Sequence, residues 1–510
     1  ELGEKELGPN DAYVAYLLER AGWLYSDKGN YARAGQLFQR ALDIDKQALG
    51  LEHPQTADAL QGLGVAYNRT GEYGKAEELL QQALTLSEQT LGPEHPTVEA
   101  VLKNFSVLHF DRGDLARSER ELQRALAIAD KTLAPDDFEV SQLLSNLGLV
   151  YIKGKDYARA EPLLQRALGI GEKKFGPDSS RLSLTLQNLG LIAQEQKKDY
   201  PRALELYWRA AKNLENSVGP EHPQVAAILN NIANIYKTQG DYAKALELHQ
   251  RVYSIFEKSL GPYHGSTLVS VGNIARTYAS MGDVSNAIKF QALTDEVIEK
   301  NLALNLAIGS ERQKLAYFDS LSERTGRTIS LHVNLAPNDS AARDLAALVL
   351  LQRKGRVLDA LSGGLSALRQ RLSGEDQKLL DELNATTAQL AKLELNGPGH
   401  TPPEEFRKQA AALDERKERL ESEVSRRSAE FRAQAQPVTL AAVRAAVPRD
   451  AALIEFAIYR PFDPRVDNLY AYGEPRYVAY IIRPQGEVEW RELGPAKEID
   501  ARVEALRQAL

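Results

Sequence analysis

The stretch LGVAYNRTGEYGKAEELLQQAL, residues 63–84, decides the fold. Its motifs Leu-Gly-x-x-Tyr, Gly-x-Tyr-x-x-Ala and Ala-Leu recur along the chain. One slot of the pattern holds a tyrosine at intervals of 42, 84, 85 and 42 residues, at Tyr25, Tyr67, Tyr151, Tyr236 and Tyr278. A one-residue insertion within residues 194–199 accounts for the interval of 85. A fixed period of this length indicates a repeat array rather than one globular core.

Each repeat unit predicts a pair of antiparallel helices. A small residue three places before the tyrosine slot allows close helix approach, at Gly22, Gly64, Ser106, Gly148, Gly190, Ala233 and Ala275. A glycine then ends the first helix, at Gly29, Gly71, Gly113, Gly240 and Gly282. A second small slot marks the place where the two helices cross, at Ala34, Ala76, Ser118, Ala160, Ala203, Ala245 and Ala287.

These motifs resemble the tetratricopeptide repeat, which normally has a period of 34 residues. Each unit here is eight residues longer, and the extra length falls in a loop with the sequence LGPEHP at residues 91–96. Related loops at 49–54 and 218–223 make residues 1–290 resemble the kinesin light chain subtype. We therefore expect a mainly α fold, a right-handed α-solenoid of 42-residue helix pairs. The loop register also indicates that the chain begins inside a repeat.

A recurring asparagine is the candidate binding feature of the repeats. It lies two residues before the small slot, at Asn104, Asn146, Asn188, Asn231 and Asn273. An amide both donates and accepts, so it can pair with the backbone of a bound peptide. The resemblance to kinesin light chain repeats implies that this position faces the concave groove, where an extended peptide or protein is the expected partner. An alternative stays open, in which each amide binds the next repeat and maintains the stack.

Histidines also recur in the repeats, but they do not suggest a metal site. His53, His95, His222 and His264 occupy one loop slot and are separated by whole repeats. We predict that they cap and pack the starts of helices. No cofactor is expected, and the chain has no cysteine to supply a thiolate ligand or nucleophile.

Charge and hydropathy argue against nucleic-acid and membrane partners. With 63 Lys+Arg against 70 Asp+Glu the net charge is −7, and no basic stripe interleaved with aromatic residues is present. No apolar run approaches the roughly 20 residues that span a bilayer. The first residues also lack the basic and apolar regions of a secretory signal.

The region after the repeats divides into three predicted parts. Residues 291–375 form a helical connector and 376–436 an antiparallel, charged helical hairpin that turns at Gly397-Pro398-Gly399. Residues 437–510 change to strands at 451–459, 476–483 and 488–493, followed by a helix from 499. In the hairpin, one apolar face is expected at Phe406, Leu413, Leu420, Val424 and Phe431, opposite Leu379, Leu383, Leu390 and Leu393.

Three further features together resemble the TPR-CHAT family. They are the long repeats, the segment RKGRVLDAL at 353–361, and AALIEF at 451–456 with YRPF at 459–462. In that family a tetratricopeptide array precedes a caspase-like domain in which a His and a Cys hydrolyse peptide bonds. The resemblance implies a prokaryotic, cytoplasmic protein. It also implies that residues 437–510 are the N-terminal part of a CHAT-like α/β domain whose remainder is a partner of this chain.

The resemblance assigns no catalytic residue to this sequence. Thiolate attack needs a Cys beside a His, and neither family motif occurs within the 510 residues. We therefore expect the chain as given to be inactive and to act as the protein-binding regulatory scaffold of a caspase-like protease. Two alternatives remain: a non-enzymatic adaptor resembling kinesin light chain, and a degenerate CHAT domain that serves only as an interaction platform.

Overall fold

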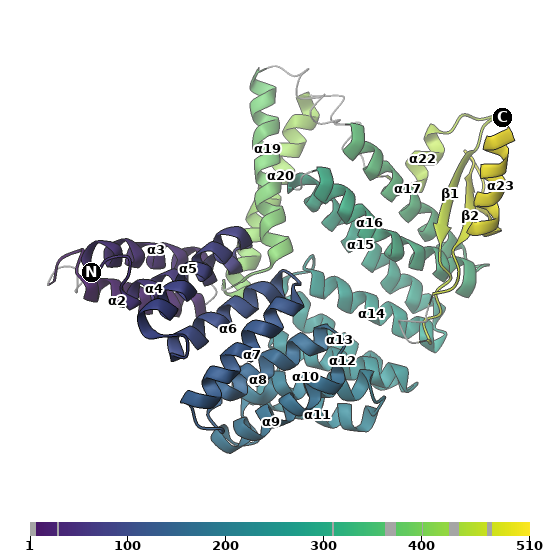
Figure 1. Ribbon diagram of the computed structural model, residues 1–510. Coiled ribbons are helices and arrows are strands. Elements are labelled where there is room, and N and C mark those ends of the chain that lie inside the picture. Colours follow the sequence, from purple (N-terminus) through teal and green to yellow (C-terminus); the bar gives the residue numbers. More distant parts are fainter. Residues whose placement is uncertain are drawn as a thin grey trace. The chain divides into compact units, whose positions relative to one another are not determined.

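The computed structural model describes residues 7–27, 30–308, 311–362, 374–399, 401–427, 438–466 and 472–509. It contains two compact units, Glu1–Pro220 and Glu221–Leu510. The first unit consists of consecutive helix pairs, in which each first helix packs against the helix that follows it (Figure 1). Its elements are α2 (Ala12–Asp27), α3 (Tyr31–Ala48), α4 (Pro54–Arg69), α5 (Tyr73–Leu91), α6 (Pro96–Asp111), α7 (Leu115–Thr132), α8 (Phe138–Lys153), α9 (Tyr157–Phe175), η1 (Ser180–Leu182), α10 (Ser183–Glu195) and α11 (Tyr200–Val218).

The second unit continues the helix pairs and ends in a small sheet. Its helical elements are α12 (Pro223–Thr238), α13 (Tyr242–Leu260), α14 (Gly265–Met281), α15 (Val284–Ile308), α16 (Glu311–Ser330), η2 (Leu331–Leu335), α17 (Ser340–Ser362), α19 (Gly374–Asn396), α20 (Pro403–Arg427), α22 (Leu440–Ala446) and α23 (Ala496–Ala509). The strands are β1 (Leu453–Tyr459), β2 (Arg476–Ile482) and β3 (Glu489–Pro495). The predicted organisation, helix pairs followed by further helices and then strands, is confirmed. Within the described ranges, every helix is too short or too polar to cross a lipid bilayer.

Helix starts in the repeats are fixed by short polar side chains. Asp156, for example, precedes α9 and its Oδ1 accepts the Arg159 backbone N–H at 3.1 Å, which satisfies one of the free donors of the first turn. The loop histidines cap first helices in the same way: Nδ1 accepts the backbone N–H two residues on at 3.2 Å, at His53, His95, His222 and His264. The prediction that these histidines serve as caps is confirmed.

The small slots explain why the paired helices lie so close together. A Cβ added to Gly148 on α8 would lie 2.7 Å from Leu164 Cγ on α9. Gly64 faces Leu80 at 2.9 Å and Gly190 faces Tyr207 at 2.8 Å in the same way. Gly71 has a φ of +83° and turns the chain between α4 and α5. Gly29 lies outside the described residues.

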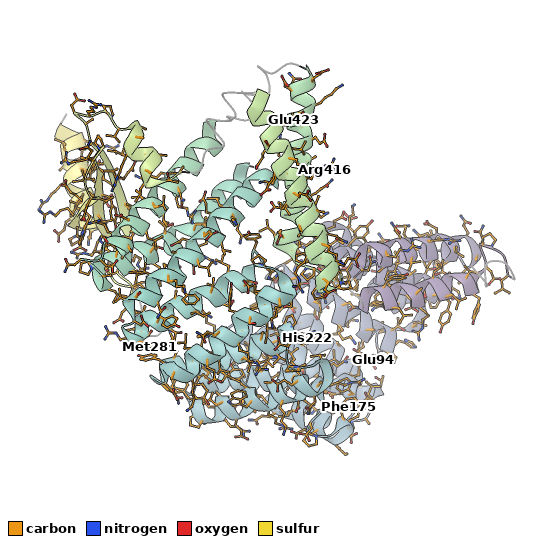
Figure 2. The ribbon with its side chains drawn as sticks, turned by 180° about the vertical axis from the view of Figure 1, so that it is seen from behind. Glu94, Phe175, His222, Met281, Arg416 and Glu423 are labelled. Atoms are coloured by element: carbon orange, nitrogen blue, oxygen red, sulfur yellow. The ribbon has the colours of Figure 1, made fainter. Side chains whose placement is uncertain are left out.

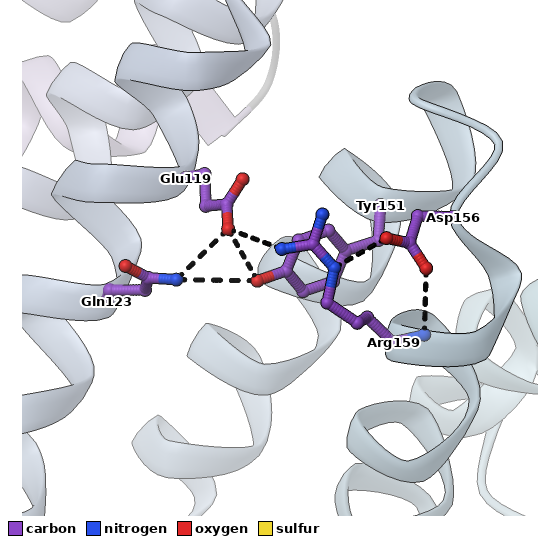
Figure 3. A network of polar contacts seen from close by, with 5 residues as sticks. All are labelled: Glu119, Gln123, Tyr151, Asp156 and Arg159. Atoms are coloured by element: carbon purple, nitrogen blue, oxygen red, sulfur yellow. Dashed lines mark hydrogen bonds and ion pairs between the residues drawn. The ribbon is translucent and has the colours of Figure 1, made fainter.

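Carboxylates connect the helix pairs of the first unit from α4–α5 onward. One of these contacts centres on Glu119 of α7, whose Oε1 accepts the Tyr151 hydroxyl of α8 at 2.8 Å and Arg159 Nη1 of α9 at 3.0 Å (Figure 3). Gln123 Nε2 donates to the same oxygen at 3.1 Å. The Arg159 guanidinium also lies 4.2 Å from the centre of the Tyr151 ring. This network joins three consecutive helices.

The sheet is an antiparallel meander in the order β1-β2-β3. One face packs on α16, η2 and α17 through a shared apolar core that includes Ile329, Leu350 and Val478. Within this core, His332 Nδ1 and the Tyr480 hydroxyl are 2.9 Å apart. The other face presents Ile454, Phe456 and Ile458 of β1, whose side chains are 49%, 52% and 54% exposed.

The charged hairpin is formed by α19 and α20, and its turn contains Gly397 and Gly399 with φ of +72° and +57°. The predicted apolar seam is confirmed at Leu383, Leu420 and Val424, which cluster with Leu379 and with Leu380, a residue that the pattern did not include. Further along the hairpin, Leu390, Leu393 and Leu413 belong to a second cluster. Phe431 lies outside the described residues. Figure 2 shows Arg416 and Glu423 projecting from α20, and Arg416 Nη2 lies 2.6 Å from Glu382 Oε1 on α19.

Phe406 has a different role from the one that the seam pattern suggests. Its side chain is 2% exposed, and a Cβ added to Gly261 would lie 3.1 Å from its ring. Because Gly261 follows α13, Phe406 attaches the base of the hairpin to a helix pair of the second unit.

Candidate peptide-binding face

The recurring asparagines all lie on first helices of the repeats, one per repeat. Within the first unit, α2 contacts α4, α4 contacts α6, and α8 contacts α10. Lys103 of α6 pairs with Glu139 of α8, so each first helix of this unit meets the next. Asn104 lies on α6, Asn146 on α8 and Asn188 on α10. Asn104 and Asn146 are partly exposed, whereas Asn188 is 8% exposed.

Polar contacts between neighbouring first helices flank these asparagines. Lys103 of α6 forms an ion pair with Glu139 of α8, and Ser145 Oγ on α8 lies 3.4 Å from Thr185 Oγ1 on α10. Burial raises the pKa of Glu99, on the same part of α6, to about 7. This face is therefore polar and carries charges of both signs.

The amides of the first unit are not used in hydrogen bonds between repeats. Within the described part of the chain, the side chains of Asn104, Asn146 and Asn188 form no hydrogen bond to another protein group. Each amide can donate two hydrogen bonds and accept two. Chemically, the three together can pair with backbone groups spaced along an extended chain.

In the second unit, the asparagines at the equivalent position differ from each other in their surroundings. Asn231 on α12 is partly exposed, but Asn273 on α14 is 3% exposed. Asn273 Nδ2 donates to Asn230 Oδ1 at 2.7 Å, and its Oδ1 accepts a hydrogen bond from Arg276. At Asn273 the amide therefore links α12 to α14, as in the alternative in which the asparagines maintain the stack.

A loop that follows β1 also lies against the first helices of this unit. The Pro464 carbonyl accepts Lys237 Nζ of α12 at 3.3 Å and Ser280 Oγ of α14 at 2.8 Å. Ser330 Oγ accepts the Phe462 backbone N–H at 2.8 Å. These contacts hold the loop at the C-terminal ends of α12 and α14. No sequence pattern predicted them.

The sequence interpretation also missed a carboxylate cluster in the first two repeats. Glu19 of α2, Asp45 of α3 and Asp58 of α4 lie near one another, since each perturbs the ionisation of another. In these repeats the asparagine position is occupied by Arg20 and Gly62. This change of residue type was the available signal that the face is built differently there.

A metal centre has no support in the geometry. Across the described ranges, no group of three His, Cys, Asp or Glu side chains is placed to hold a metal ion.

A family model matches the helix pairs, and several solved structures resemble the chain at low identity. The model of the family described as tetratricopeptide repeat matches residues 13–89, 63–131, 139–216, 185–258 and 224–292. The crystal structure of BtubC (BKLC) from P. vanneervenii is 22% identical, with 46% of this chain and 90% of that chain covered and a TM-score of 0.38. A putative kinesin light chain from Podosopora anserina with nearly identical TPR-like repeats is 22% identical, with 49% and 98% covered and a TM-score of 0.27. A comparison with curated proteins gives no match. Because the matched ranges together span more than half of the 510 residues, the chain belongs to the tetratricopeptide repeat family.

Proposed function

We propose that this protein is a scaffold whose first helices bind an extended segment of a partner protein. The observation that carries the proposal is the set of unpaired amides at one position of three first helices, at Asn104, Asn146 and Asn188. Packed helix axes lie about 8–10 Å apart, and an extended chain rises about 3.3 Å per residue. Successive amides would therefore meet about every third residue of the partner's backbone.

The two asparagines of the second unit, Asn231 and Asn273, are not equally available to a partner. Asn231 is partly exposed, so its amide is accessible to a partner that contacts the second unit. The Asn273 side-chain amide is already hydrogen-bonded to Asn230 and Arg276. It could contact a partner only if those hydrogen bonds broke. We therefore assign the main contribution to Asn104, Asn146 and Asn188.

The test begins with a partner peptide. It is selected from a displayed library of random peptides, with the full chain as the bait. The triple variant Asn104→Ala, Asn146→Ala, Asn188→Ala should then weaken its Kd about 100-fold, because each amide contributes roughly 1 kcal/mol through its hydrogen bonds. Fluorescence anisotropy with the labelled peptide measures the change. The control is Asn216→Ala, which alters an exposed asparagine of α11, a second helix.

Two results would count against this proposal. An unchanged Kd in the triple variant would show that the amides do not contact the partner. A large fall in the unfolding midpoint, measured by circular dichroism, would show that the amides maintain the stack. The proposal requires the reverse of both: weaker binding with nearly unchanged stability.

We further propose that this scaffold regulates a caspase-like cysteine protease of the prokaryotic cytoplasm, with the catalytic His and Cys outside this chain. The resemblance to TPR-CHAT proteins suggests it, and the exposed apolar face of β1 supports it. Ile454, Phe456 and Ile458 stand about half exposed on a strand at the edge of the sheet. Exposed apolar side chains grouped on one face mark a contact surface, so further structure over this face would complete such a domain.

Two observations test the proposed link to a cysteine protease: the full-length protein sequence, and labelling of the full-length protein with a thiol-directed probe. A peptidyl chloromethyl ketone with a basic or apolar end residue should label one cysteine of the full-length protein. Because residues 1–510 contain no cysteine, mass mapping must place that label elsewhere in the protein. A full-length sequence without a His and Cys pair would remove the protease proposal and leave the scaffold proposal standing.

A further inference from the structure

A cavity of about 360 Å³ opens between the first helices of the first two repeats. Glu19, Tyr16 and Trp23 line it from α2, and Asp58 and Gln61 line it from α4. The cavity therefore combines two carboxylates with two aromatic rings. It lies on first helices, the same side of the array that carries the asparagines further along.

Glu19, the acid that lines this cavity from α2, forms no ion pair with a protein cation within the described residues. Glu19 is 5% exposed, and its Oε1 forms no hydrogen bond within the described residues. Behind it, Asp45 of α3 is completely buried, and its hydrogen-bond partner is the protonated Glu19 carboxyl. The two acids therefore share a proton away from water, and no ion pair with a protein cation balances them within the described residues.

The repeat architecture does not require these acids. The positions equivalent to Asp45 in later repeats hold Ser87, Ala129, Gly171, Leu214 and Phe256. The positions equivalent to Glu19 hold Gln61, Lys103, Ser145, Gln187, Asn230 and Gly272. Because helix pairs form equally well without a carboxylate at either place, the acids are a local feature of the first repeats.

Arg20 is at the cavity but does not neutralise it. Its guanidinium lies 5.7 Å from the centre of the Tyr16 ring, and the residue is exposed. Within the described part of the chain it forms no ion pair with Glu19 or Asp58. Its position shows that a cation can approach the ring face of Tyr16 from solvent.

We propose that this cavity binds a basic side chain, Lys or Arg, of the partner segment. Tyr16 and Trp23 offer apolar ring surface to a long aliphatic stem, and the cationic head would reach Glu19 and Asp58, which line the same cavity. A bare metal ion suits the site poorly, since the described residues offer no adequate ligand group and the cavity is much larger than an ion. The inference rests on the proposed function in one respect: the basic side chain is taken to belong to the segment that the asparagines hold.

Burial and the neighbouring Asp45 and Asp58 raise the pKa of Glu19 to about 9, while Arg20 lowers it. His53 lowers the pKa of Asp45 on the other side of the pair. The empty cavity is therefore protonated at Glu19 near neutral pH. A bound cation would favour the ionised carboxylate and release that proton, so affinity should rise with pH between about 7 and 9.

The test uses N-acetyl-lysine methylamide as the probe, and its norleucine counterpart, which has a similar stem but no charge. Trp23 lines the cavity, and its indole NMR signal, assigned with Trp23→Phe, reports binding to the full chain. The lysine probe should shift this signal to saturation, with at least tenfold tighter binding than the norleucine probe. Alanine methylamide, whose ammonium group is at the backbone, should bind as weakly as norleucine. Equal effects of all three probes, or no saturation with lysine, would overturn the inference.

Variants locate the contact. Glu19→Gln and Asp58→Asn should each weaken lysine binding about tenfold to a hundredfold, as expected for the loss of a charge-assisted bond. The matched control Asp43→Asn makes the same charge change at an exposed residue of α3 and should leave binding unchanged. If Glu19→Gln alters folding, Asp58→Asn carries the test, because Asp58 is exposed at the cavity mouth.

This inference and the proposed function can fail separately. If the lysine probe still binds the triple variant Asn104→Ala, Asn146→Ala, Asn188→Ala, that result supports the cavity inference and says nothing about the asparagines. A selected peptide that depends on the asparagines, but binds equally well when its basic residues are replaced by norleucine, supports the scaffold and refutes the cavity.

Discussion

The small slot of the repeat makes a sharp prediction at Gly148. An added Cβ would lie 2.7 Å from Cγ and 2.9 Å from Cδ2 of Leu164, a side chain that is completely buried. Gly169 on α9 is the matched control, because it is exposed and an added Cβ would meet nothing within 4 Å. Both glycines lie inside helices of the same repeat, so both gain about 1 kcal/mol in helix propensity from alanine.

The difference in free energy of unfolding between Gly148→Ala and Gly169→Ala measures the cost of packing the added methyl group. Overpacking a well-filled core costs typically about 1–3 kcal/mol. Gly169→Ala should therefore stabilise the protein by about 1 kcal/mol, whereas Gly148→Ala should lie about 1–3 kcal/mol below it. The propensity gain cancels in this difference, which leaves the contact with Leu164 as its cause.

Urea unfolding followed by circular dichroism measures the free energy of unfolding of each variant. Because repeat arrays and separate units can unfold in steps, hydrogen exchange of peptides from α8 and α9 should show the same difference locally. Gly148→Ala and Gly169→Ala variants that agree within about 0.5 kcal/mol would refute the reasoning. A smaller side chain at Leu164, as in Leu164→Ala, should relieve the overlap and make Gly148→Ala neutral or stabilising in that background.

Three further predictions concern single side chains. Tyr151→Phe should lower the free energy of unfolding in urea by about 0.5–1.5 kcal/mol, because the hydroxyl donates to Glu119 at 2.8 Å; an effect that persists in the Glu119→Ala background, which has no acceptor at this place, would contradict this origin. The folded pKa of Glu19 is raised from 4.5 to about 9, so the native state holds a proton that the unfolded state has lost, and the stability this gives is full below about 4.5 and is lost as pH rises to 9. Urea unfolding across this range should show a smaller decline for Glu19→Gln than for wild type, and parallel curves would exclude the assignment. Ser280→Ala removes the 2.8 Å bond to the Pro464 carbonyl and should speed hydrogen exchange in the loop around Pro464, with unchanged exchange counting against the docking.

The sequence was sufficient for the parts of the fold that follow from local periodicity. The spacing of Gly64 and Gly148 from their tyrosines predicted tightly paired helices, because a small side chain is needed wherever two helices approach closely. His95 and its equivalents were predicted as caps from their place before a proline. The hairpin seam around Leu383 and Leu420 followed from heptad spacing. Each of these conclusions depends on residues within one or two turns of a helix, or on a residue type that recurs at the same position of several repeats.

The candidate site could be predicted only in part. Sequence spacing placed Asn104, Asn146 and Asn188 on first helices, because a repeat conserves the position of a residue in its unit. It did not determine the partner of each amide. Asn273 bonds to Asn230 on the preceding first helix, 43 residues away, and that choice depends on the side chains that the neighbouring repeat happens to present.

The sequence by itself thus determined the array of 42-residue helix pairs, the hairpin and the change to strands, since these arise from local pattern. Only the tertiary structure brought Glu19, Asp45 and Asp58 together from three helices and removed the first two side chains of that group from solvent. Only the tertiary structure laid the Pro464 loop against α12 and α14, across 227 and 184 residues of chain. Burial and long-range contact depend on the whole packed chain, so no local pattern contains them.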